Sequence, residues 1–433
     1  MKKLLALVLL AGCVSCGLQV KDDKDNKVDV ENPFSVSSPQ PTTPLTKLSL
    51  TQEETAYVAA GNTLAFKLFN LLGGGTDSFV LSPLSIQYAL GMTANGASGE
   101  TLTELVQALG FEDGNLDALN AYCHKLLNEL PALDLNVTLK LADALLVNSG
   151  YPLLPAFQKT VEDTYYAVVD NMSFSDPEKV AGRINDWSSR NTNGLIDKML
   201  DASEIHPDAI AYLMNALYFK ARWLGGERNP LFQEYATYEQ EFYLGGNLLA
   251  TLPTMHASGY FRYADMGSYG VLELPYDGEK FAMYILLPHS KADDDKQLVR
   301  DFPTLDWAQV LSSLKQREVI LSLPKFEIAS SYSLKDALQS LGVEQAFGMQ
   351  ARFDRMFANP DVDAYISKVI QNARIAVAEW GTEAAAVTVV EMAEKSSMPS
   401  EDIVRFTCDH PFAWLIAERS SGVVLFEGAY RGN

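Results

Sequence analysis

From residue 51 to the C-terminus, the sequence mixes strand-like and helix-like segments in an irregular order, with no internal repeat and no linker. Short apolar or β-branched runs such as 79–81 predict strands, and amphipathic stretches such as 116–130 predict helices. A doubly wound parallel sheet needs regular alternation of strands and helices, and this pattern is absent. The sequence therefore predicts a single α+β domain, residues 49–433, with antiparallel or mixed sheets.

Local start and stop signals mark the helices of this domain. Ser82 followed by Pro83 predicts a helix with a hydroxyl cap and a proline in its first turn, and Ser98 begins another. Three glycines from Gly73 onwards end a helix over 51–72. Further helices are predicted over 155–165, 177–190 and 333–341, and further strands over 137–147, 211–219, 271–274, 281–287, 319–323, 366–378 and 403–406.

The N-terminus resembles the export signal of bacterial lipoproteins. Two lysines precede a short apolar run, 4–10, which is too short to span a bilayer. The sequence Leu-Ala-Gly-Cys then ends at Cys13, which we expect to be acylated after removal of residues 1–12. Cys16 is a poorer candidate, and an ordinary secretory signal is the alternative. The protein is thus expected in the cell envelope as an outer-membrane lipoprotein, with its membrane leaflet left open.

Residues 13–48 are predicted to form a flexible tether between that lipid anchor and the domain. They are rich in Lys, Asp, Ser, Pro and Thr and contain few large apolar side chains, so they cannot bury enough surface to fold. The acidic run at 21–23 resembles signals that send some lipoproteins to the cell surface, which favours surface exposure.

Composition and motifs exclude several classes of function. The net charge of −21 argues against nucleic acid or an anionic membrane surface as a partner. The histidines show no metal-ligand spacing, and no nucleophile elbow, Walker loop or dinucleotide-binding glycine motif occurs, so no cofactor, metal or catalytic residue is predicted. Cys123 and Cys408 are read as buried thiols, with a disulfide as the open alternative. We expect a monomer.

The stretch 379–398, EWGTEAAAVTVVEMAEKSSM, has contradictory local preferences. Thr382 and the alanines after Glu383 favour the start of a helix, whereas the β-branched run from Val387 favours a strand. With Gly381 at its start and no proline before Pro399, the stretch suits a segment that changes conformation. A solvated surface loop is the simpler interpretation.

Seven blocks of the sequence resemble the serpin family, in the family's order and over nearly the whole chain from about residue 51. They are SFVLSPLSIQYALGMTANGASGETLTEL (78–105), INDWSSRNTNGLIDKML (184–200), LMNALYFKARW (213–223), VLELPYDGEKFAMYILLP (271–288), LPKFEIASSYSLKDALQSLGV (323–343), GTEAAAVTVV (381–390) and DHPFAWLIAERSSGVVLFEGAYRGN (409–433). The resemblance implies three sheets, eight or nine helices and an exposed reactive loop at about 379–402.

In inhibitory serpins a protease cleaves this loop and forms an acyl-enzyme, and the loop then inserts as a central strand and distorts the protease. An inserting strand must present small or apolar side chains inward at alternate positions. That face reads Thr382, Ala384, Ala386, Thr388, Val390 and Met392, and the other includes Glu383, Ala385 and Val387. This pattern favours inhibition; the rivals are a non-inhibitory serpin acting as a binding module and, more distantly, a cell-surface hydrolase.

The family places the cleaved bond fourteen residues beyond the hinge Gly381, between Lys395 and Ser396. A lysine there suits the acidic specificity pocket of trypsin-like proteases, which are therefore the preferred partners. Cleavage after Met392 or Met398 by chymotrypsin- or elastase-like enzymes is the alternative, and cysteine proteases could be trapped in the same way.

The resemblance also assigns two regions of the large sheet. The shutter, where the sheet opens, corresponds to Ser82, Ser85 and Asn215, with Gln371 in place of the family's frequent histidine. At the breach, the top of the sheet, Trp223 matches the family's tryptophan, and Lys325 and Glu379 are expected to pair. Gln371 keeps the hydrogen bonds of a histidine without its titration. Trp380, a bulky residue beside the hinge, departs from the usual polar residue.

Overall fold

The computed structural model describes residues 43–111, 114–207, 209–226, 229–291, 296–359, 364–366, 369–382 and 403–433. Thr51 caps the first helix with both halves of a capping box, because its hydroxyl accepts from the Glu54 amide and Glu54 accepts from the Thr51 amide. The α-helices within these ranges are α1 (Gln52–Leu72), α2 (Pro83–Gly96), α3 (Gly99–Ala108), α4 (Leu116–Ala132), α5 (Pro155–Tyr165), α6 (Pro177–Asn191), α7 (Lys296–Asp301), α8 (Trp307–Ser313) and α9 (Lys335–Ser340).

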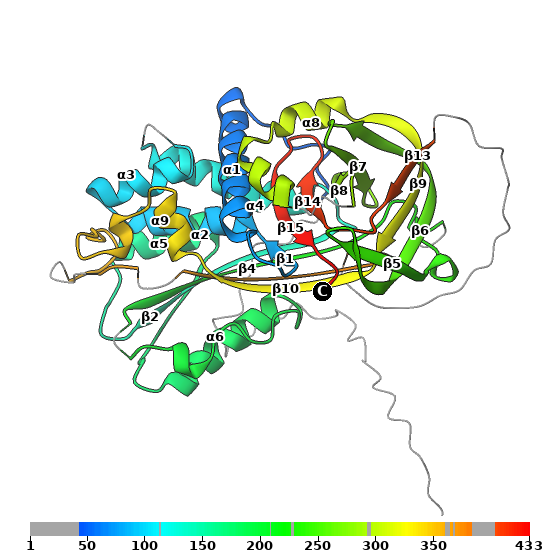
Figure 1. Ribbon diagram of the computed structural model, residues 1–433. Coiled ribbons are helices and arrows are strands. Elements are labelled where there is room, and N and C mark those ends of the chain that lie inside the picture. The colour runs from blue at the N-terminus through cyan, green and yellow to red at the C-terminus, as the bar shows by residue number, and fades with distance from the viewer. Residues whose placement is uncertain are drawn as a thin grey trace, which may run out of the picture.

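The strands alternate irregularly with these helices (Figure 1), and the predicted α+β class is confirmed. They are β1 (Phe79–Leu81), β2 (Thr138–Asn148), β3 (Val168–Met172), β4 (Ala211–Arg222), β5 (Tyr238–Leu244), β6 (Asn247–Asp265), β7 (Tyr269–Pro275), β8 (Phe281–Pro288), β9 (Lys315–Pro324), β10 (Phe326–Ser333), β11 (Ile370–Ala378), β12 (Gly381–Thr382), β13 (Val404–Thr407), β14 (Phe412–Glu418) and β15 (Val424–Tyr430).

One hydrogen-bonded sheet contains nine strands in the order β1-β15-β14-β8-β7-β6-β9-β13, with β5 paired to β6. The long strand β6 belongs to two parts of this sheet. Its first part pairs with β5, its middle with β9, and its end with β7. The three sheets that the resemblance implies are therefore present as one separate sheet and two that are joined through β6.

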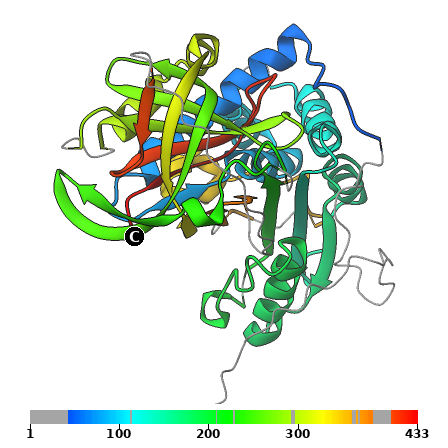
Figure 2. The ribbon, with the colours of Figure 1, turned by 90° about the vertical axis from the view of Figure 1, so that its right-hand side faces the viewer.

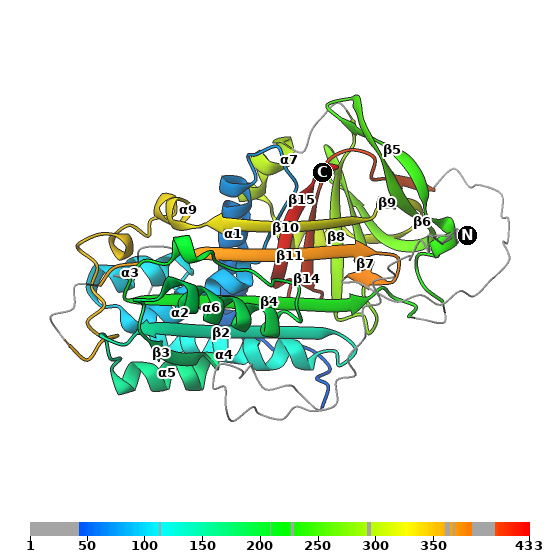
Figure 3. The ribbon, with the colours of Figure 1, turned by 90° about the horizontal axis from the view of Figure 1, so that it is seen from below.

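The separate sheet has six strands in the order β10-β11-β12-β4-β2-β3, which Figure 3 shows from below. β10 and β11 are antiparallel, as are β2 and β4, whereas β2 and β3 are parallel. The two-residue strand β12 lies between β11 and β4 and pairs with both.

The inner face of the six-stranded sheet is buried, whereas its outer face is only partly covered and alternate residues of β10 are exposed. Its outer face carries α6, which lies away from the nine-stranded sheet in Figures 1 and 2 and packs Ile184 and Trp187 against Ala144 and Met214. The inner face joins the main core with α2 and the nine-stranded sheet. Leu139 and Asp143 on β2 point to this inner side, since alternate residues of a strand face opposite ways.

Two expectations about the N-terminal part need correction. Residues 43–48 belong to the predicted tether, yet the Leu45 amide donates to the Ala132 carbonyl, and Leu48 is buried. The predicted boundary at residue 48 is therefore a few residues too late. Ser82, predicted to cap α2 with its hydroxyl, stands at the N-cap but makes no capping hydrogen bond, because its hydroxyl donates to the Leu425 carbonyl instead. Among the described residues, no helix is long and apolar enough to cross a membrane.

Candidate functional site: hinge, breach and shutter of the six-stranded sheet

The hinge of the predicted loop is already part of the sheet. β11 ends at Ala378, the chain turns through Glu379 and Trp380, and Gly381 and Thr382 return as β12. Thr382 pairs with Val377 on β11 and also with a residue of β4, and its side chain is only 2% exposed. The hinge therefore forms a two-residue strand between β11 and β4.

Only glycine fits at position 381. A Cβ atom on Gly381 would lie 2.0 Å from the carbonyl oxygen of Ala221 and 2.8 Å from the Cα atom of Arg222. Both distances are far below van der Waals contact, so any side chain would push β12 away from β4. The glycine that marks the start of the resemblance to the serpin loop thus has a packing reason.

The breach is built around stacked aromatic rings. Trp223 lies directly after β4 and is buried, and its ring stacks on Tyr276 with centroids 4.8 Å apart and an interplanar angle of 7°. The indole Nε1 donates to the Ala378 carbonyl at 2.8 Å, and the Trp223 amide donates to the Trp380 carbonyl at 3.1 Å. Trp223 therefore holds the turn that presents the hinge.

An ion pair closes the top of the same region. The ammonium of Lys325 lies 2.9 Å from a carboxylate oxygen of Glu379, as the sequence predicted, and the Thr237 hydroxyl donates to the other oxygen at 2.9 Å. Burial opposes ionisation of Glu379, but the hydrogen bonds from Lys325 and Thr237 outweigh it and hold the pKa of this carboxyl below its ordinary value. Glu379 is thus an anion that ties the turn to β9 and β10.

Three of the four shutter residues, Ser82, Ser85 and Gln371, form one buried hydrogen-bond network. The Ser82 amide donates to Gln371 Oε1 at 3.2 Å, and Gln371 Nε2 donates to the Ser82 carbonyl at 2.6 Å. The Ser82 hydroxyl lies 3.0 Å from Ser85 Oγ and 3.0 Å from the Leu425 carbonyl. Gln371 therefore links β11 to the start of α2 through neutral hydrogen bonds.

Asn215 does not join that network directly. Its Nδ2 donates at 2.7 Å to Oδ1 of Asp143, which lies opposite it on β2. Burial raises the pKa of the Asp143 carboxyl to about 7, and the hydrogen bond from Asn215 only partly offsets this. Asp143 Oδ2 and Asn215 Oδ1 are buried without a hydrogen-bond partner. The shutter therefore contains a carboxyl that titrates near neutral pH.

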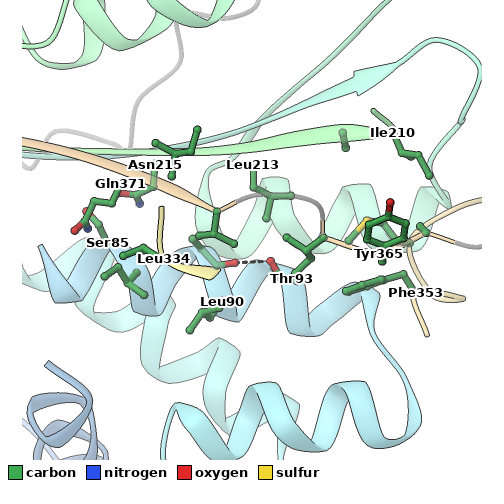
Figure 4. A pocket seen from close by; sticks show the side chains of 18 of the residues that line it. Ser85, Leu90, Thr93, Ile210, Leu213, Asn215, Leu334, Phe353, Tyr365 and Gln371 are labelled. Atoms are coloured by element: carbon green, nitrogen blue, oxygen red, sulfur yellow. Dashed lines mark hydrogen bonds between the residues drawn. The ribbon is translucent and has the colours of Figure 1, made fainter. Parts of the chain in front are cut away.

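A cavity of about 90 Å³ lies beneath the place where β4 and β11 face each other. Figure 4 shows its lining, with Asn215 and Leu213 from β4, Gln371 from β11, and Thr93 from α2 below them. Within the described part of the chain, β4 and β11 share no ladder with each other and are joined only through β12. Among the described residues, no strand other than β12 pairs with these two facing edges.

Several residues of this site give no signal of their role in the sequence. Tyr276 and Thr237 lie in polar, turn-like segments, and nothing local points to their partners. Asp143 could have been singled out, because it is the one charge in the apolar run 141–147. The predicted residues Cys13, Glu383, Ala384, Ala385, Ala386, Val387, Thr388, Lys395 and Ser396 lie outside the described residues.

No metal site is found among the residues that the structure describes. No group of three or more His, Cys, Asp or Glu side chains there could hold a metal ion. Cys123 and Cys408 are free and buried, as predicted, and burial raises the pKa of the Cys123 thiol to about 12.

Comparison with known proteins agrees with this geometry. The family model described as Serpin (serine protease inhibitor) matches residues 59–431. The chain belongs to the serpin family. Iripin-2 of the tick Ixodes ricinus is 34% identical over 87% of this serpin and 94% of its own length. An uncharacterized serpin-like protein of Thermococcus kodakarensis is 30% identical over 98% of this chain and 96% of its own.

The fold agrees as well. The native-state crystal structure of tengpin, a thermophilic serpin, superposes with a TM-score of 0.79 at 25% identity, covering 93% of this chain and 98% of that one. The matched family is described as one of serine protease inhibitors and not of catalytic enzymes. The predicted serpin fold is thereby confirmed.

Proposed function

We propose that this serpin inhibits trypsin-like serine proteases as a suicide substrate, by inserting its cleaved loop between β11 and β4. The observation that carries the proposal is strand β12. Gly381 and Thr382 already pair with both neighbours, so insertion continues a strand that exists before cleavage. A loop that served only as a binding module would not need its hinge buried in the sheet.

The pairs of Thr382 set the register of every residue that follows. Thr382 lies opposite Val377 on one side and Ala221 on the other, and both pairings are antiparallel. Six residues further along, the ladder brings Thr388 opposite Gln371 on β11 and Asn215 on β4. Thr388 would then lie at the shutter, where Oδ1, the side-chain amide oxygen of Asn215, has no hydrogen-bond partner.

The same register decides which side chains face the core. Thr382 points inward, since its hydroxyl meets the buried Tyr276. Every second residue after it shares that face. The inward residues would then be Ala384, Ala386, Thr388, Val390 and Met392, which are small, apolar or hydroxylated. Glu383 and Glu391 would stay on the outer face.

The open edges of β4 and β11 supply the driving force. Each new backbone hydrogen bond contributes about 0.5–1.5 kcal/mol net, so about ten of them contribute on the order of 10 kcal/mol. Val390 and Met392 would add burial of apolar surface over the cavity between Leu213 and α2. This gain is large enough to distort a protease that remains attached to the loop as an acyl-enzyme.

The proposed reactive bond joins Lys395 and Ser396. A lysine side chain entering the acidic pocket of a trypsin-like enzyme gains an ion pair that other side chains lack. Incubation with trypsin should give a complex of summed mass that survives denaturing electrophoresis, with a released fragment beginning at Ser396. A fragment that begins after Met392 or Met398 would show that the reactive bond lies there and that chymotrypsin- or elastase-like proteases are the targets.

Two variants make this experiment decisive. Lys395→Ala should lose inhibition of trypsin but keep the fold, as judged by its thermal midpoint. Thr382→Arg should turn the inhibitor into a substrate, because an inward arginine cannot be buried without a partner. Cleavage of the wild-type protein without a stable complex would contradict the proposal, and so would unchanged inhibition by Thr382→Arg.

We also propose that a lipid on Cys13 anchors the inhibitor to the bacterial cell envelope. The support is the Leu-Ala-Gly-Cys sequence after a short apolar run. Metabolic labelling with a fatty-acid analogue should mark the wild-type protein in the membrane fraction, and Cys13→Ser should remove the label. Labelling that persists in Cys13→Ser would refute this attachment site.

A further inference from the structure

Tyr276 is held rigidly at the breach. It follows β7 directly, its amide donates to the Phe281 carbonyl at 3.0 Å, and its residue forms a β-bridge with Trp223. The phenol ring is fully buried and stacks on the Trp223 ring. The position of its hydroxyl is therefore fixed by the surrounding structure rather than chosen by a mobile side chain.

That hydroxyl meets the hinge. Tyr276 Oη lies 2.6 Å from Thr382 Oγ1, and either group can donate. Both side chains are buried, so losing one hydroxyl leaves the other without water to replace it. Burial raises the pKa of the Tyr276 phenol far above its ordinary value, so the group stays neutral across the physiological range.

We infer that Tyr276 is a positioning residue for loop insertion: its hydroxyl holds Thr382 inside the sheet as the first pair of the inserting strand. This inference rests on the proposed function, since it assigns a role within insertion. Because Tyr276 keeps the first residue pair of the strand formed before cleavage, the cleaved loop has only the remaining pairs to form.

The hinge needs such a hold because β12 is very short. Two residues give few ladder hydrogen bonds, and an isolated pair of this kind is marginal against the entropy of the free chain. Gly381 makes no side-chain contact of its own, so the Thr382 hydroxyl is the anchor of this strand. The register places Thr382 at the same point after insertion, so the contact with Tyr276 need not break.

The speed of insertion decides the fate of the acyl-enzyme. A slower start leaves more time for deacylation, which releases active protease and cleaved serpin. Weakening the hinge should therefore raise the ratio of cleaved to complexed inhibitor, measured as the stoichiometry of inhibition, while the rate of cleavage stays unchanged. Loss of one buried hydrogen bond should increase this ratio roughly two- to tenfold.

The test uses Tyr276→Phe, which keeps the stacked ring, and Thr382→Val, which keeps the shape of the hinge residue. Each should speed amide hydrogen exchange of residues 379–382 in the uncleaved protein and raise the stoichiometry of inhibition of trypsin. The double variant should be no worse than the more affected single variant, because both changes remove the same bond. Tyr260→Phe, at a residue 71% exposed on β6, is the matched control.

Unchanged exchange and stoichiometry in Tyr276→Phe would overturn the inference, and fully additive effects in the double variant would do the same. Failure of the proposed function looks different: the wild-type protein itself would then form no stable complex with trypsin. In that case hydrogen exchange alone decides whether Tyr276 holds the hinge, because it is measured without a protease.

Discussion

Replacing Asp143 by asparagine should remove a loss of stability that sets in as the pH rises. Asp143 is 1% exposed, and its carboxyl accepts one hydrogen bond, from Asn215. Burial raises its pKa from 3.8 to about 7. An asparagine side chain has nearly the same shape, and its carbonyl oxygen can accept the same hydrogen bond without any titration.

The sign follows from the proton that each state binds. Between about pH 4 and pH 7 the folded protein keeps the Asp143 proton and the unfolded chain loses it, so the free energy of unfolding falls as the pH rises through this window. Above pH 7 both states are ionised and the loss is complete. The pKa of Asp143 differs between the unfolded state (3.8) and the folded state (about 7). At about 1.36 kcal/mol per pKa unit, this difference lowers the free energy of unfolding by about 4 kcal/mol.

Urea unfolding followed by tryptophan fluorescence, at pH values from 4 to 8.5, measures the effect. The difference between Asp143→Asn and wild type should be small near pH 4, grow to about 4 kcal/mol in favour of the variant by pH 7, and stay level above that. Asp186→Asn, an exposed position on α6, should leave the pH profile unchanged. A difference for Asp143→Asn that does not depend on pH would refute the reasoning.

Three further changes probe other buried positions, two of them in this sheet and the third, Glu427, on β15 of the nine-stranded sheet. Gln371→Leu removes both hydrogen bonds to the main chain of Ser82. Each buried group left without a partner costs about 1–3 kcal/mol of stability, so the urea midpoint should fall. Gly381→Ala places a Cβ atom 2.0 Å from the Ala221 oxygen, so the stoichiometry of inhibition should rise above the wild-type value. Glu427 is buried without a partner, and burial raises its pKa well above the ordinary value, so Glu427→Leu should raise the urea midpoint more at pH 8 than at pH 4.5.

Elements with strong local signals were predicted closely from the sequence. The strand 79–81 and the helix 155–165 have the predicted bounds, and α1 begins within one residue of its predicted start at residue 51. The long strand β6 was not predicted, because its 19 residues carry mixed burial on both faces and show no clean alternation. Ser82 was misread as a capping hydroxyl, since its real partner Leu425 lies far along the chain.

Some residues of the candidate site were predicted from the sequence, and others were found only in the structure. Gly381, Trp223, Gln371 and the pair Lys325–Glu379 were identified through the resemblance to serpins, and the structure places them around one end and the middle of one sheet. Tyr276 was not predicted, because a single aromatic residue in a turn forms no distinctive sequence pattern. Its meaning comes from two contacts across the fold, with Trp223 and with the hinge.

The sequence alone determined which residues of the loop could enter a sheet, because alternation of side chains along a strand is a local property. Only the tertiary structure decided where the strand begins, that Thr382 already lies between β11 and β4, and that Asp143 meets Asn215, which is 72 residues away. Pairing and burial depend on which distant segments come together, so no local pattern can supply the register of the hinge or the pKa of a shutter carboxyl.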